Sequence, residues 1–132
     1  MWEHMKRLGN LLVIGLLRSP FHRLASGSLV LITYRGRSSG RRFTIPVMYA
    51  KRDGTLTIFV GHPERKRWWR NLRGGAEVDV WLRGRRVRRR ADVVKDRAAV
   101  ETYLDRYPRA RITIETADSP IFVRLAALTP KD

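Results

Sequence analysis

Apolar residues recur with two different periods along the chain. Near the N-terminus, Met5, Leu8, Leu12 and Leu16 follow one another at spacings of three and four, which predicts a helix over Met1–Leu17. From Ser28 onward, β-branched, aromatic and alternating apolar residues are typical of strands instead. The strands that this pattern predicts are Ser28–Tyr34, Arg42–Lys51, Thr55–Val60, Ala76–Leu82, Arg85–Val94 and Ile121–Leu128.

Turn and cap residues divide the chain between these segments. Asp53-Gly54 is a strong hairpin signal, and Pro46 inside a strand predicts an edge position or a bulge. Two further short helices are expected. His62–Leu72 has no strand alternation, and Asp96–Tyr107 begins at an aspartate cap. Antiparallel hairpins with short connections favour a closed or partly open barrel, mainly β with α, over a parallel sheet.

We expect a single domain over residues 1–132, with an N-terminal amphipathic helix in residues 1–18 and the barrel in residues 28–128. The N-terminal helix either packs over one end of the barrel or lies on an anionic membrane surface. Its apolar run, Leu11–Leu17, is shorter than the roughly 20 residues that span a bilayer. No signal peptide is evident.

The charge balance narrows the class of partner. The chain has 28 Lys and Arg against 12 Asp and Glu, a net charge of +16. Such a field attracts nucleic acid, an acidic membrane surface or an anionic small molecule, although coding bias toward arginine gives the same enrichment. Cysteine is absent, which excludes a cysteine nucleophile and a thiolate metal site. It also fits a reducing compartment, so we expect a cytoplasmic protein that is membrane-associated only if the N-terminal helix binds lipid.

A basic glycine- and serine-rich turn joins the first two strands. Its sequence from Gly36 to Arg42 is GRSSGRR. The glycines allow a close approach to a ligand, consecutive N–H groups can form an anion-binding concavity, and arginines bind phosphate oxygens in pairs. The turn is thus a candidate phosphate loop. The alternative is an ordinary solvated hairpin turn.

A second candidate site is the segment KRWWRNL from Lys66 to Leu72. Adjacent tryptophans on a helix point about 100° apart, so Trp68 and Trp69 cannot share one narrow core stripe. One indole can pack inward while the other lines a cavity wall. The alternative is that both lie in the core.

Taken together, three features are similar to a known family. They are Leu29–Pro46 (LVLITYRGRSSGRRFTIP), the strand–Asp-Gly–strand hairpin after it, and WWRNL at Trp68–Leu72 followed by a glycine-rich turn. In order and spacing the chain resembles the deazaflavin-dependent nitroreductase family, within the flavin and deazaflavin oxidoreductases. The resemblance implies an antiparallel, Greek-key-like split β-barrel of about six strands. It also implies hydride transfer from the reduced deazaflavin coenzyme F420 to a quinone, a nitro compound or another activated alkene.

The resemblance also suggests which residues hold the cofactor. It assigns residues 37–40 to the phosphate and tail, places Trp68 and Asn71 beside the cofactor, and runs the strand through Thr44 and Pro46 beneath the ring. With their basic and aromatic neighbours, the expected cofactor-binding residues are Arg37, Ser38, Ser39, Gly40, Arg42, Thr44, Pro46, Lys66, Trp68, Trp69 and Asn71. Ser38 stands where family members usually have lysine, and Phe43 where they often have arginine. FMN is therefore the alternative cofactor.

Among the histidines, His62 is the candidate catalytic residue, because it follows a strand end close to the tryptophans. An imidazole there can donate a proton or stabilise developing negative charge, and the alternative is a loop histidine without a role. No metal site is expected, because Glu3, His4 and His22 lack metal-site spacing.

Two other functions remain open. One is an FMN-binding or cofactor-carrier protein without turnover. The other, less favoured, is a nucleic-acid-binding barrel that uses the arginines of Arg83–Arg90. By analogy with split barrels we expect a homodimer.

Overall fold

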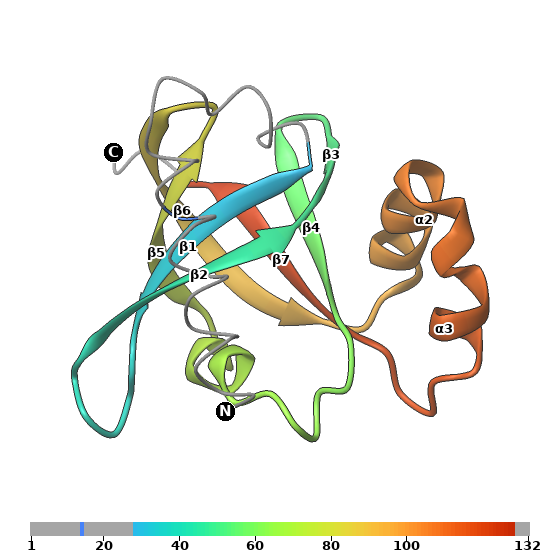
Figure 1. Ribbon diagram of the computed structural model, residues 1–132, viewed down its shortest axis with the longest axis horizontal. Coiled ribbons are helices and arrows are strands. Elements are labelled where there is room, and N and C mark those ends of the chain that lie inside the picture. Colours follow the sequence, from blue (N-terminus) through green and yellow to red (C-terminus); the bar gives the residue numbers. More distant parts are fainter. Residues whose placement is uncertain (1–13, 15–27, 129–132) are drawn as a thin grey trace.

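The fold is a seven-stranded antiparallel sheet that curls into a barrel (Figure 1). The computed structural model describes residue 14 and residues 28–128. The spatial order of the strands is β2-β1-β5-β6-β7-β4-β3. The strands are β1 (Leu29–Arg35), β2 (Arg42–Met48), β3 (Ala50–Arg52), β4 (Thr55–Val60), β5 (Ala76–Leu82), β6 (Arg85–Val94) and β7 (Ile121–Ala127).

The prediction of one strand over Arg42–Lys51 is wrong, and this raises the strand number from about six to seven. The segment divides at Tyr49, because β2 pairs with β1 whereas β3 pairs with β4. β2 and β3 are also the two edges of the sheet. Tyr49 is therefore the corner at which the chain passes directly from one edge to the other, with its side chain in the barrel core. Pro46 lies on an edge strand, as its missing N–H predicts.

Alternating residues of the strands fill the barrel. In β1 the side chains of Val30, Ile32 and Tyr34 belong to the core, and in β4 those of Leu56 and Ile58 do so. This alternation is the period of two that the sequence shows. Side chains of β6 alternate between the two faces of the sheet in the same way. Val87 faces the core, while Arg89 at the end of the barrel donates a hydrogen bond to the carbonyl oxygen of Gly54 at 3.2 Å.

The helix predicted over His62–Leu72 forms only in its last part, as the 3₁₀ helix η2 (Trp68–Leu72). Its first part is irregular, because His62 adopts a left-handed backbone conformation with φ of 53°. The carbonyl of Pro63 turns back and accepts a hydrogen bond from the indole N–H of Trp69 at 2.9 Å. An N–H donor on the helix thus holds the preceding loop.

A second apolar cluster lies outside the barrel, where α2 (Arg97–Arg106), η3 (Pro108–Ala110) and α3 (Arg111–Glu115) cover one side of it (Figure 1). The predicted aspartate cap is confirmed, since Asp96 accepts a hydrogen bond from the N–H of Ala99 at 2.9 Å. Neither η3 nor α3 was expected. They follow Pro108, which ends α2 but is well placed in the first turn of the next helix.

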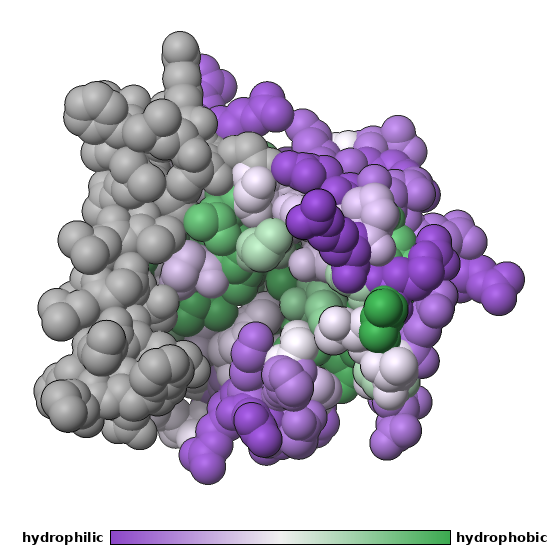
Figure 2. Space-filling model, turned by 45° about the vertical axis from the view of Figure 1, so that its right-hand side comes forward, coloured by the Kyte–Doolittle hydropathy of each residue, from purple (hydrophilic) through white to green (hydrophobic). Residues whose placement is uncertain are grey.

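The predicted N-terminal helix of residues 1–18 lies outside the described residues, apart from Ile14, which is helical. None of the helices in the described part of the chain has the length and apolar character that crossing a bilayer requires. Figure 2 shows that hydrophilic residues cover most of the described surface on the face drawn, and that hydrophobic residues gather in a hollow near its middle.

Candidate functional site

The predicted phosphate loop is a tight turn between β1 and β2, which stay paired up to Arg35 and Arg42. The N–H of Gly36 donates to the carbonyl of Arg41, and the N–H of Gly40 donates to the carbonyl of Gly36, both at 2.8 Å. Gly40 has a φ of 69°, which an L side chain rarely adopts. These bonds fix the backbone of the loop.

Several donors of this loop remain available. The side chains of Arg37, Ser38 and Arg41 are exposed, and neither arginine forms an ion pair within the part of the chain that the structure describes. In that same part, the backbone N–H groups of Ser38 and Ser39 donate to no acceptor. The hydroxyl of Ser39 instead accepts from the N–H of Arg41 at 3.2 Å. A preformed turn with unpaired cations and amides suits an anion.

The loop and the tryptophan segment are in direct contact. The N–H of Arg37 donates to the side-chain oxygen of Asn71 at 3.0 Å. The amide nitrogen of Asn71 donates in turn to the carbonyls of Arg67 and Trp68, at 3.3 and 3.2 Å. Asn71 therefore ties the loop to η2. The structure brings together the two segments that the sequence predicts to bind one cofactor.

Aromatic rings form a row behind the loop. The ring of Tyr34 stacks on that of Phe43, with centroids 5.5 Å apart, and lies 6.5 Å from that of Trp68. Phe43 is 42% exposed, whereas Tyr34 is 9% exposed and its burial raises the pKa of its hydroxyl. Phe43 was not expected at the site. The strand register could have identified it, because Phe43 pairs directly with Tyr34 across the hairpin and lies on the same face of β2 as Ile45.

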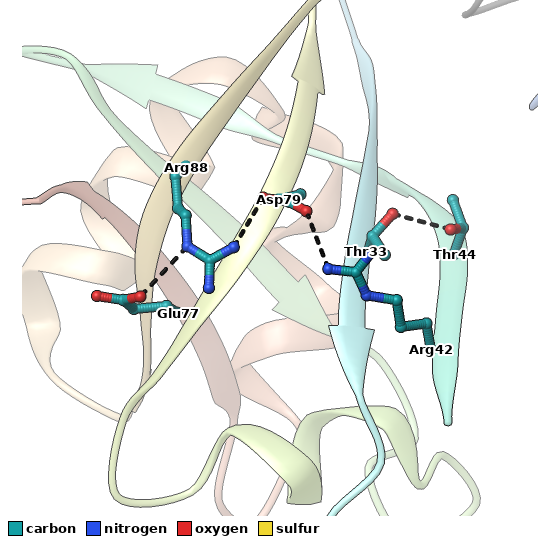
Figure 3. A network of polar contacts seen from close by, with 6 residues as sticks. All are labelled: Thr33, Arg42, Thr44, Glu77, Asp79 and Arg88. Carbon is teal, nitrogen blue, oxygen red and sulfur yellow. Dashed lines mark hydrogen bonds and ion pairs between the residues drawn. The ribbon is translucent and has the colours of Figure 1, made fainter. Parts of the chain in front are cut away.

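Arg42, Thr44 and Pro46 lie on the other face of β2, so the structure separates them from the aromatic row. On that face the hydroxyls of Thr44 and Thr33 are 2.8 Å apart. A chain of charges follows (Figure 3), in which Asp79 lies between Arg42 at 4.0 Å and Arg88 at 3.2 Å, and Arg88 also reaches Glu77. A cavity of about 350 Å³ lies here, lined by Thr33, Tyr34, Arg35, Arg42, Glu77, Asp79 and Arg88.

The same charge chain bears on the arginine run of β6. Arg88 is paired with two carboxylates, and Arg90 lies 3.3 Å from Asp92. Among the residues that the structure describes, Arg88 and Arg90 are thus neutralised on the protein itself, whereas Arg86, on the same outward face, is exposed and forms no ion pair.

A larger cavity of about 660 Å³ lies on the opposite side of η2, between it and the segment that joins α3 to β7. We call it the η2–α3 cavity. Trp69 lines it from the core, is 4% exposed, and carries the guanidinium of Arg73 over its ring at 4.6 Å. His62 lies at the rim with its side chain 71% exposed, 3.7 Å from Glu64. Lys66 is exposed and lines neither of the two cavities.

The two tryptophans therefore diverge, as their adjacency predicts. Trp68 faces the aromatic row and Trp69 the η2–α3 cavity. Loop and cavity meet at the end of η2. Arg73 lines the cavity, and a Cβ added to its neighbour Gly74 would lie 3.8 Å from the guanidinium of Arg37. The fold alone brings the other lining residues to the cavity, namely Lys95, Thr113 and the segment before β7. No local sequence pattern predicts their place there.

Comparison with known proteins places this geometry in a family. The model of the F420H2-dependent quinone reductase family matches residues 19–126. A search of curated proteins finds no match.

Solved structures share the fold. One described as a domain-swapped dimer has a TM-score of 0.64 at 19% identity, covering 74% of this chain and 79% of that one. An F420-H2 dependent reductase, FDR-A, has a TM-score of 0.58 at 18% identity, covering 74% and 93%. HutZ, the heme storage protein from Vibrio cholerae, has a TM-score of 0.56 at 12% identity, covering 86% and 92%. The family model carries the assignment: the chain belongs to the F420H2-dependent quinone reductase family and is an F420-dependent reductase with F420 as its cofactor.

Proposed function

We propose that this protein transfers hydride from reduced F420 to a quinone, with the cofactor phosphate held by residues 37–40 and the acceptor in the η2–α3 cavity. The observation that carries the proposal is the hydrogen bond from Arg37 to Asn71, since it joins the basic loop to the helix that lines the cavity. The family description supports a quinone as the acceptor.

The residues present fit an anionic cofactor with a flat ring. Arg37, Arg41 and the free amides of Ser38 and Ser39 offer donors to a phosphate. The cavity volume of about 660 Å³ lies within the roughly 300–1,000 Å³ typical of ligand sites. Hydride transfer requires contact between donor and acceptor, so the η2–α3 cavity has to admit both the cofactor ring and the quinone ring. The cavity reaches the loop through Arg73, which lines it, and Gly74, which lies near the guanidinium of Arg37.

Reduced F420 supplies the hydride when bound, and the quinone takes up that hydride and one proton to become a hydroquinone. The protein has to orient the two rings, exclude water and deliver the proton. Trp69 and the neighbouring apolar wall of Phe59, Val60 and Ile121 can perform the first two tasks. We assign the proton to His62, which lies at the rim between the cavity and solvent.

A titration tests the cofactor assignment. F420 fluorescence is followed as purified protein is added, with FMN as the comparison cofactor. We expect Arg37→Gln to weaken F420 binding about tenfold, the effect of losing one charge-assisted contact. Arg97→Gln removes an equal charge from α2 and is the control. Unaltered affinity in Arg37→Gln would remove the loop from the proposal, whereas failure of any quinone to oxidise bound F420H2 would remove the acceptor.

We also propose a homodimer, a cytoplasmic location and a lipid contact. A homodimer is supported by the likeness to a domain-swapped dimer, and light scattering on the purified protein tests it. A cytoplasmic location, and a lipid contact through residues 1–18, await fractionation and liposome pelleting of the full chain against a chain without those residues.

A further inference from the structure

The η2–α3 cavity has an apolar wall and a basic one. Phe59, Val60, Trp69 and Ile121 provide the apolar wall. Arg70 and Arg73 of the η2 end and Lys95 after β6 provide three cations. The cations come from two separate parts of the sequence, so only the fold brings them to one cavity.

None of these three cations forms an ion pair within the described part of the chain. Six other arginines do, namely Arg42, Arg52, Arg88, Arg90, Arg111 and Arg124. In a chain of net charge +16 carboxylates are scarce, yet the cavity also contains Glu64 and Asp118. Glu64 lies next to His62, at 3.7 Å, and Asp118 has no ion-pair partner in the described part. The three cations therefore share the cavity with two carboxylates but are ion-paired to neither.

Aromatic stacking fixes the position of one of the cations. The guanidinium of Arg73 lies 4.6 Å from the ring centre of Trp69, and that of Arg70 lies 5.7 Å away. Trp69 itself cannot turn freely, because it is buried and its N–H is bonded to Pro63. A guanidinium held over an indole keeps its N–H donors free for a planar anion.

We propose that the η2–α3 cavity selects an acceptor that carries a negative charge on a flat apolar ring, such as an aromatic carboxylate or sulfonate. Arg70, Arg73 and Lys95 bind the anionic substituent, and the apolar wall binds the ring. This inference rests on the proposed function, because it names the class of acceptor for the same site. The other source of such an anion is the acidic tail of the cofactor, and the experiments below separate the two.

The first experiment compares two quinones that differ in one charge, 1,4-naphthoquinone and 1,4-naphthoquinone-2-sulfonate. The sulfonate alters the reactivity of the ring equally for every variant, so the ratio of the two kcat/KM values, compared between variants, reports recognition of the charge. Arg70→Gln/Lys95→Gln leaves the Arg73–Trp69 stack in place. We expect it to lower the ratio of sulfonate to neutral quinone about tenfold, or about 1.4 kcal/mol. Arg97→Gln, which lies outside the cavity, should leave the ratio unchanged.

Two results would overturn the proposal. One is an unchanged ratio in the double variant. The other is a loss of F420 affinity of that size with no change in the ratio, which would assign the cations to the cofactor tail.

The second experiment needs no turnover and so remains decisive if the proposed function fails. The full-length protein without cofactor is titrated with 2-naphthoate and, separately, with the neutral 2-naphthamide, and the indole N–H signals are followed by NMR. Naphthoate should shift the signal of Trp69 and leave that of Trp68 nearly in place, since η2 separates the two indoles. Equal responses to the acid and the amide, or a response at Trp68 alone, would rule out a charge-selective cavity.

Discussion

The side-chain oxygen of Asn71 accepts a hydrogen bond from the backbone N–H of Arg37 at 3.0 Å, across 34 positions of the sequence. The same side chain donates to two carbonyls of its own helical segment. Both polar atoms of this one amide are therefore used within the protein, the oxygen on the basic loop and the nitrogen on its own segment. In the proposed cofactor site, Asn71 thus positions the loop without needing to touch the cofactor.

We predict that Asn71→Ala lowers the affinity for F420 about fivefold and the free energy of unfolding by about 1 kcal/mol, because each is the effect of losing a net hydrogen bond. Fluorescence titration and urea unfolding measure the two quantities. Glu115→Ala removes an exposed ion pair on α3 and serves as the control for an unrelated surface change. Full F420 affinity in Asn71→Ala would show that the loop keeps its shape without this anchor.

Gly40 offers a test of the loop backbone. It has a φ of 69°, and an added Cβ would meet no atom within 4 Å. Gly40→Ala therefore introduces backbone strain without a clash, and we expect it to cost about 1 kcal/mol of unfolding free energy. Gly40→Asn should cost less, because asparagine tolerates the left-handed region. Equal losses in the two variants would mean that crowding, and not the backbone angle, requires glycine here.

Ser38 lies in the middle of the loop that we propose to hold the cofactor phosphate. Its side chain is exposed and its N–H is unpaired within the described residues. We expect Ser38→Lys to raise F420 affinity by about threefold to tenfold at low salt, because it adds a cation beside the phosphate. The gain should shrink as salt screens the charge. Titrations at two salt concentrations measure it, and an affinity that falls in both would place the phosphate away from this residue.

Asp96 connects the α2 cap with the sheet. The hydrogen bond from Ala99 has the largest effect and lowers the pKa of its carboxyl below the ordinary 3.8. Burial opposes this in part, and the pairing with Arg124 lowers the pKa further. A group with a lowered folded pKa stabilises the protein above its unfolded pKa, and this contribution disappears as the pH falls through the folded pKa.

Asp96→Asn keeps a capping side chain but loses the charge. We predict that it is less stable than the parent protein at neutral pH, by less than about 1 kcal/mol since the pair is exposed. The difference should diminish as the pH falls through the lowered pKa of Asp96. Urea unfolding across a pH series from neutral into acid measures it, with Asp96→Ala as the variant that lacks both cap and charge. A difference that persists in acid would assign the stabilisation to the cap alone.

Local patterns predict most of this fold, because strand alternation, the Asp-Gly turn and the aspartate cap are properties of neighbouring residues. They fail at Tyr49, where a continuous β-branched and apolar run changes its pairing partner without any turn residue. They fail again at His62–Arg67, where helix-compatible residues fold back because a tertiary hydrogen bond from Trp69 holds Pro63.

The site divides in the same way. Two segments of distinct chemistry, the loop and the tryptophans, are visible in the sequence and do meet although they are far apart in it. The face of β2 that a residue occupies decides whether it meets them, and this places Phe43 near the loop and Thr44 away from it. The cations of the η2–α3 cavity come from positions 70, 73 and 95, which only the completed barrel makes neighbours.

The corner at Tyr49 has a mechanical consequence. The two margins of a curled sheet are ordinarily held together by side chains alone. Here the covalent backbone at Tyr49 joins them directly. Loosening β2 from β1 pulls on β3 and its partner β4, whose far end leads directly to His62 and the cavity. Under the proposed function, a phosphate that tightens the turn at the start of β2 also restrains the opposite margin, and filling the loop then stiffens the proposed acceptor chamber.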